Sequence, residues 1–165
     1  VSAYGADHEQ HQSGHERIDM TWQPHITVAT IIEDQGRFLL VEELKQDRLV
    51  LNQPAGHLEA NESLRQAALR ETLEETGWDG ELTGVVGIYL YTAPSNGVIY
   101  QRVCFAAKPL RHHAERSLDT DIAGTLWLSR DELAAQPQRW RSELVPRCID
   151  DYLNGPLHGL EVIRD

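Results

Sequence analysis

The sequence has little cysteine and no long apolar run. Its two cysteines, Cys104 and Cys148, lie far apart without the spacing of metal ligands, so we expect two reduced thiols in the core. No apolar stretch approaches the length of a membrane span, and the first residues do not combine a basic segment with an apolar one. We therefore expect a cytoplasmic protein that contacts no membrane.

The sequence also lacks an excess of positive charge. It has 26 acidic and 15 basic residues, and its net charge is −11. A face that binds nucleic acid needs a basic stripe, so we expect no nucleic-acid partner. A phosphorylated small molecule is still compatible with an acidic site if metal ions lie between the two.

The length of 165 residues suits one well-buried domain. Residues Val1–Asp19 are polar and show no apolar periodicity, and Met20 follows directly. We interpret residues 1–19 as an N-terminal extension or arm and residues 20–165 as the folded domain.

Four segments read as strands that form two hairpins. His25–Ile32 and Arg37–Glu42 are rich in β-branched and apolar residues and are separated by a turn that contains Gly36. Leu82–Tyr91 and Val98–Ala107 form the second pair. Because helical segments alternate with these strands, the pattern predicts an α/β sandwich around a mixed sheet.

The main helix is predicted between Asn61 and Gly77. Asn61 is a good N-cap, and residues 63–76 contain no glycine or proline. Gly77 then ends the helix as a C′ glycine. A last amphipathic helix is predicted over Ser142–Leu153, interrupted early by Pro146.

Three carboxylates of the main helix lie on one of its faces. Glu71, Glu74 and Glu75 are spaced i, i+3 and i+4, and like charges so close repel one another. A hard divalent cation relieves this repulsion, and Mg²⁺ binds through a few carboxylates while keeping waters and substrate phosphates. The spacing therefore indicates a site for Mg²⁺, with Mn²⁺ as an alternative ion.

A longer motif contains these carboxylates. Its fixed positions are Gly56, Glu62, Arg70, Glu71, Glu74, Glu75 and Gly77. They match every fixed position of the Nudix box, G-x5-E-x7-R-E-U-x-E-E-x-G-U, in which U is a bulky apolar residue. Thr72 and Trp78 occupy the U positions, and only Thr72 departs from the pattern. The chain thus resembles the Nudix hydrolases.

Three further segments are similar to the NudJ-type phosphatases of this superfamily. They are Asn52–Glu59, Pro24–Ala29 and Ser117–Trp127. The resemblance implies an α/β/α sandwich with a central mixed sheet and a monomer or homodimer. It also implies metal-dependent removal of phosphate from nucleoside tri- and diphosphates, with the thiamin-pathway pyrimidine pyrophosphate as a further substrate.

We expect the metal to be held by Glu71, Glu74 and Glu75, with the backbone carbonyl of Gly56 and, further out, Glu59. Gly56 suits this role because backbone without a side chain can approach a metal closely. Arg70, next to Glu71 and four residues before Glu74, is expected to hold these carboxylates in place. The remaining box residues, Glu62 and Gly77, are assigned structural roles.

The general base and the substrate contacts are less local in the sequence. Asp121, six residues before Trp127, is one candidate base, and Glu74 and Glu75 are the others. Gln53 and Arg102 are the expected polar contacts of the substrate. Candidate aromatic residues for stacking a base are Trp22, Tyr89, Tyr91 and Tyr100.

Two other functions are compatible with the pattern. Pro94 stands 16 residues after Trp78, about where Nudix enzymes specific for ADP-ribose carry a proline, which makes ADP-ribose pyrophosphatase the first alternative. A Nudix domain that senses a nucleotide without cleaving it is the second. Such domains usually have gaps in the box, and here the three helix carboxylates are all present.

Overall fold

The computed structural model describes residues 25–164. The expected arm at residues 1–19 and the stacking candidate Trp22 lie outside this range. The strands are β1 (His25–Asp34), β2 (Arg37–Lys45), β3 (Arg48–Asn52), β4 (Ala55–His57), β5 (Trp78–Thr92), β6 (Ile99–His112) and β7 (Ile122–Ser129). The helices are α1 (Leu64–Thr76), α2 (Arg130–Ala134) and α3 (Leu144–Asn154), with 3₁₀ turns at Pro137–Arg139 and Leu160–Val162.

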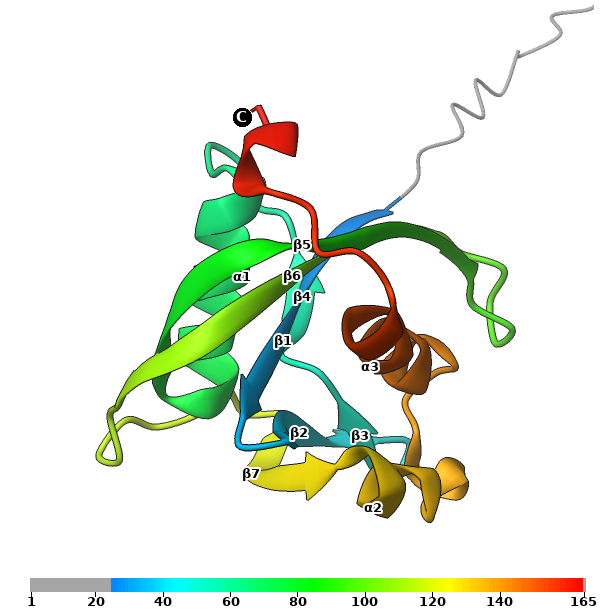
Figure 1. The fold of residues 1–165 in the computed structure, drawn as a ribbon. Helices are drawn as coiled ribbons and strands as arrows, with labels where there is room; N and C mark the ends of the chain where they lie inside the picture. The colour runs from blue at the N-terminus through cyan, green and yellow to red at the C-terminus, as the bar shows by residue number, and fades with distance from the viewer. Residues whose placement is uncertain (1–24, 165) are drawn as a thin grey trace, which may run out of the picture.

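The strands form one mixed, seven-stranded sheet in the order β3-β2-β1-β6-β5. β1 runs parallel to β6, whereas β5 and β6 pair antiparallel. β4 is an additional partner of β1, and β7 of β2. Figure 1 shows α1 and α3 on opposite sides of the part of the sheet made by β1, β5 and β6. This confirms the predicted α/β/α sandwich with a mixed sheet.

The central strands are buried on both faces, because neighbouring side chains point to opposite helices. Val28 of β1 belongs to the cluster that contains Ala67 and Ala68 of α1. The next residue, Ala29, belongs to the cluster that contains Cys148 of α3. β1 therefore reads as a nearly continuous apolar run and anchors both layers. Both cysteines are buried and free, as predicted.

The start of α1 differs from the prediction. Ser63 is the N-cap, since its hydroxyl accepts from the Gln66 N–H and the Gln66 side chain accepts from the Ser63 N–H. The assignment of Asn61 as N-cap was wrong. Asn61 has a φ of 67°, a left-handed conformation that asparagine tolerates, and it forms part of the turn before the helix. The helix ends at Gly77, whose φ is 70°.

Other boundaries also shift. β5 begins at Trp78, directly after the helix, and not at Leu82, and Ala55–His57 form a short strand, β4. α3 is continuous through Pro146, because proline in the first turn removes an N–H that has no intrahelical partner. No helix of the described residues is long and apolar enough to cross a membrane.

Candidate functional site

The loop around Gly56 is pressed against the helix carboxylates. β4 pairs with β1 through Gly56 and Val28, which fixes the position of this backbone. A Cβ atom built on Gly56 would lie 2.1 Å from the carboxylate carbon of Glu71. Such a contact is too short for real atoms, so only glycine lets the β4 backbone approach the Glu71 carboxylate this closely.

Glu75 is buried one turn further along the same helix face. Only 8% of this residue is exposed, and its Oε2 atom accepts a hydrogen bond from the Ala55 N–H at 2.9 Å. The pKa of Glu75 is raised to about 8, mainly by burial and to a smaller extent by the nearby carboxylates of Glu43 and Glu71. At neutral pH a positive charge beside Glu75 would therefore stabilise the ionised form of its carboxyl group.

Arg70 links the remaining box carboxylates. Its Nη1 atom donates to Glu71 at 2.8 Å and to Glu74 at 3.0 Å. Nε and Nη2 donate to the two carboxylate oxygens of Glu62 at 2.9 and 2.7 Å, and Nη2 also donates to the His57 carbonyl at 3.1 Å. The Arg70 guanidinium thus connects Glu62, before the helix, with Glu71 and Glu74 on it.

These contacts change the titration of the acids in opposite directions. The bonds from Arg70 hold the pKa of Glu62 below its usual range. The pKa of Glu71 is raised, because its burial outweighs the favourable contact with Arg70. Glu62 is therefore neutralised by its ion pair with Arg70. Glu71, which lies against the Gly56 backbone, is in an environment that favours binding of a cation.

The donor set suits a hard cation. Glu71, Glu74 and Glu75 supply carboxylate oxygens, the Gly56 carbonyl is a further oxygen donor, and Mg²⁺ prefers such ligands. Within residues 25–164, no three acidic, histidine or cysteine side chains already converge as a metal cluster. Arg70 holds two of the carboxylates in the structure, so binding of a cation requires these side chains to turn inward.

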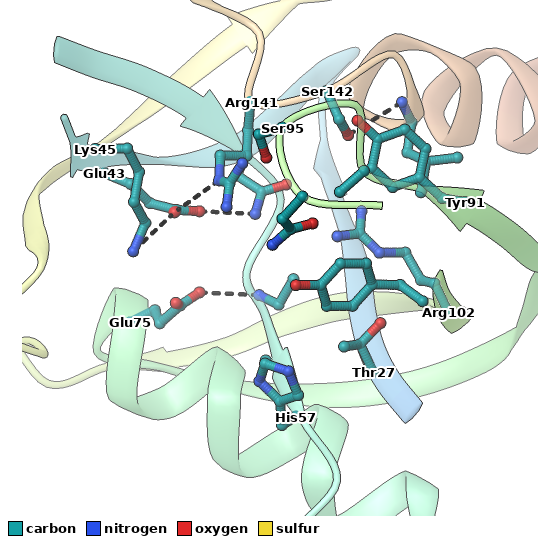
Figure 2. A pocket seen from close by; sticks show the side chains of 17 residues that line it. Thr27, Glu43, Lys45, His57, Glu75, Tyr91, Ser95, Arg102, Arg141 and Ser142 are labelled. Carbon is teal, nitrogen blue, oxygen red and sulfur yellow. Dashed lines mark hydrogen bonds and ion pairs between the residues drawn. The ribbon is translucent and has the colours of Figure 1, made fainter. Parts of the chain in front are cut away.

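A cavity of about 260 Å³ opens beside Glu75. Figure 2 shows Glu75 on α1 at one side of it and Arg102 on β6 at the other, with His57 below. The lining residues are Thr27, Glu43, Lys45, Asn52, Ala55, Gly56, His57, Glu75, Tyr91, Ala93, Ser95, Asn96, Tyr100, Arg102, Arg141, Ser142 and Leu144.

The substrate-binding candidates separate into two groups. Arg102, Tyr91 and Tyr100 line the cavity. Gln53 does not, because it is 1% exposed and its side-chain amide donates to the Val145 carbonyl at 2.6 Å. Tyr89 is also buried, and its hydroxyl donates to Asp151 at 2.9 Å.

Two carboxylates predicted at the site are exposed: Asp121, a candidate general base, and Glu59, a candidate outer metal ligand. Asp121 has 71% of its side chain exposed and forms an ion pair with Lys45 at 3.1 Å. It lines a second hollow, which shares Glu43, Lys45 and Glu75 with the main cavity. Glu59 is 69% exposed and lies 3.9 Å from Arg70.

Glu43 is the main site residue that the sequence reading missed. Only 6% of it is exposed; its carboxylate accepts from the Asn52 amide at 2.7 Å and lies 3.6 to 3.7 Å from Arg141 and Lys45. An acid within the otherwise apolar β2 pattern was the available indication, since buried acids are nearly always paired.

The fold and the acids of α1 correspond to those of a class of hydrolases that generally depend on a divalent metal. The chain matches the NUDIX domain family over residues 21–148, and it belongs to the Nudix family of hydrolases. Phosphatase NudJ of Escherichia coli (strain K12) is 37% identical over 144 residues, which span 87% of this chain and 93% of that protein. The predicted relationship to Nudix hydrolases of the NudJ type is confirmed.

Solved structures agree with this assignment. A NUDIX hydrolase from Nitrosomonas europaea shares 42% identity and superposes with a TM-score of 0.85, covering 87% of this chain and 97% of that one. An ADP-ribose pyrophosphatase from Streptococcus suis has a TM-score of 0.62 at 18% identity, over 82% of this chain and 96% of that one. The second match shows the shared fold only.

Proposed function

We propose that this chain is a Mg²⁺-dependent hydrolase of phosphoanhydride bonds in nucleoside tri- and diphosphates. The observation that carries the proposal is the close approach of the Gly56 backbone to the Glu71 carboxylate, because it places a backbone segment and two box acids together: Glu71, and Glu75, which accepts from the neighbouring Ala55 N–H. The relationship to phosphatase NudJ supports the choice of a phosphorylated small molecule.

Bound Mg²⁺ supplies positive charge to phosphate oxygens and lowers the pKa of a coordinated water. Glu71, Glu74 and Glu75 would hold it with the Gly56 carbonyl. Arg70 holds Glu71 and Glu74 beside each other on α1, and these two carboxylates would turn from Arg70 toward the cation when it binds. The protein thus contributes mainly orientation and charge, as phosphoryl transfer requires.

The proton of the attacking water needs an acceptor. Glu75 suits this role best among the candidates by position, because it is buried and lines the cavity. Asp121 is a weaker candidate in the same role, because Lys45 already neutralises it and most of its side chain faces water.

The test is a phosphate-release assay with and without Mg²⁺. The panel contains nucleoside tri- and diphosphates, the thiamin-pathway pyrimidine pyrophosphate and ADP-ribose. We expect orthophosphate from tri- and diphosphates only with the metal present. AMP formed only from ADP-ribose would contradict the proposal, and tight binding without turnover would make the protein a nucleotide sensor.

Substitution of Glu74 tests whether turnover depends on the proposed metal site. Glu74→Gln keeps the shape of the side chain and the helix but removes one ligand charge, and we expect turnover to fall by about two orders of magnitude or more. The matched control is Glu81→Gln, which removes an exposed carboxylate near the start of β5 that is not part of the box. Near-normal turnover in Glu74→Gln would mean that the metal is held elsewhere.

A further inference from the structure

Arg102 is a half-buried cation, and two of its nitrogen atoms have no partner among the described residues. Its Nε and Nη1 atoms are shielded from solvent and make no hydrogen bond to any of residues 25–164. No carboxylate of the described chain lies within ion-pair distance of it. Shielded N–H groups without a partner are costly, so the surroundings of Arg102 favour a ligand that offers hydrogen-bond acceptors.

The register of the sheet points Arg102 into the main cavity. It is paired with Thr27 of β1 on one side and with Tyr89 of β5 on the other. Tyr100, two residues earlier on the same face, is paired with Tyr91. In Figure 2 the Arg102 side chain reaches from β6 toward the cavity below Tyr91. The far end of the cavity is therefore an arginine between aromatic side chains.

These neighbours fit a flat ring better than a phosphate group. Thr27 and Tyr91 lie beside Arg102, Asn96 and Tyr100 also line the cavity, and all four are uncharged. Phosphate sites normally combine several cations or a series of backbone N–H groups. The other cations of the cavity, Lys45 and Arg141, both lie against Glu43. Aromatic walls with a few polar groups at the edge are typical of a pocket for a heterocycle.

We propose that this end of the cavity holds the nucleobase and that Arg102 selects bases with a carbonyl oxygen. The proposal rests on the proposed function, and it adds the class of base. A guanidinium has donors and no acceptor. Guanine presents the acceptors O6 and N7, and uracil presents two carbonyl oxygens, whereas adenine has an amino donor in place of O6. Adenine therefore places a donor opposite the donors of Arg102.

The experiment compares kcat/KM for GTP, UTP and ATP in the wild-type protein and in Arg102→Met. We expect the wild type to prefer GTP and UTP over ATP by about tenfold or more, because a site built for a hydrogen bond rejects a ligand that lacks it. Arg102→Met should reduce this preference to about threefold or less by lowering the values for GTP and UTP. Arg111→Met, at an exposed position of the same strand, is the matched control and should retain the wild-type preference.

Two results would overturn the proposal. One is a wild-type preference for ATP or no preference at all. The other is an equal loss for all three nucleotides in Arg102→Met, because this pattern places Arg102 on the phosphate chain that they share. The variant should fold, and its melting temperature should equal or exceed that of the wild type, because the substitution removes two shielded nitrogen donors that have no partner among the described residues.

A binding measurement separates this proposal from the proposed function. Calorimetry with GMP and AMP needs no turnover and no scissile phosphoanhydride. If no nucleotide is hydrolysed but GMP binds at least about tenfold more tightly to the wild type than to Arg102→Met, the base site is supported and the hydrolase proposal fails. Absence of GMP binding to the wild type would overturn the base site.

Discussion

Gly56→Ala should separate the folding of this protein from its chemistry. The added Cβ would lie 2.1 Å from both Cδ and Oε1 of Glu71, whereas ordinary contacts begin at 3.4 Å. The obstacle is the end of a flexible side chain, so Glu71 can retreat, but its carboxylate must move by about 1.3 Å. That shift breaks the 2.8 Å bond with Arg70 and displaces an expected metal ligand.

The expected magnitudes differ for activity and stability. Misplacing a catalytic group by about 1 Å can reduce the rate by about a hundredfold, so we expect turnover to fall at least this far. Loss of the bond from Arg70 should lower the free energy of unfolding. The loss should not exceed about 1 to 2 kcal/mol, because the released carboxylate regains hydrogen bonds to water. Activity is measured by phosphate release with Mg²⁺, and stability by denaturant unfolding with EDTA.

A double-mutant cycle makes the test sharper. Once Glu71→Ala has removed the obstacle, adding Gly56→Ala should change stability by less than about 0.5 kcal/mol. Gly124→Ala is the control, because its nearest neighbour would be a Glu42 oxygen at 3.8 Å. The reasoning is refuted if Gly56→Ala keeps most of its turnover, or if the stability losses of Gly56→Ala and Glu71→Ala simply add.

Two further predictions concern stability. In the folded state the pKa of Glu75 is raised to about 8, so folding favours the protonated form of this side chain. The stability that this preference contributes is fully present below about pH 4.5. It is lost as the pH rises through 8. Glu75→Gln should therefore raise the free energy of unfolding in EDTA at pH 7 by about 1 to 3 kcal/mol and change it little near pH 4.5; an equal change at both pH values would contradict this. Ser63→Ala should lower it by about 1 kcal/mol through loss of the helix cap, with Ser63→Asn, which keeps a capping side chain, as the control that costs less; equal losses in the two variants would contradict the cap.

The acidic face of α1 was predictable because it is local in the sequence. Glu71, Glu74 and Glu75 must share one helix face, and the period of the helix makes this a matter of spacing alone. The helix end at Gly77 follows from the same short window. The start was misread because Asn61 and Ser63 both suit a cap, and the reciprocal bond to Gln66 decides between them.

The substrate contacts were less predictable, because they depend on which way each side chain of a strand or loop points. Asn52 lines the cavity while its neighbour Gln53 is buried behind it. Tyr91 reaches the cavity while Tyr89, two residues away, is buried and bonded to α3 through Asp151. Propensity does not distinguish such neighbours, since register and the packing of a distant helix decide the outcome.

The division between local and non-local residues has a physical basis. A metal site needs ligands at nearly fixed distances, which one helix turn and one pinned backbone loop can provide. A base-binding pocket needs walls on several sides, and here β1, β5 and β6 contribute Thr27, Tyr91 and Arg102 from distant parts of the chain. Substitutions in these strands can therefore change which base is held while Gly56 and Glu71 keep the same contact on α1. Specificity and chemistry in this protein should accordingly be separable by mutation, with Arg102 affecting the first and Gly56 the second.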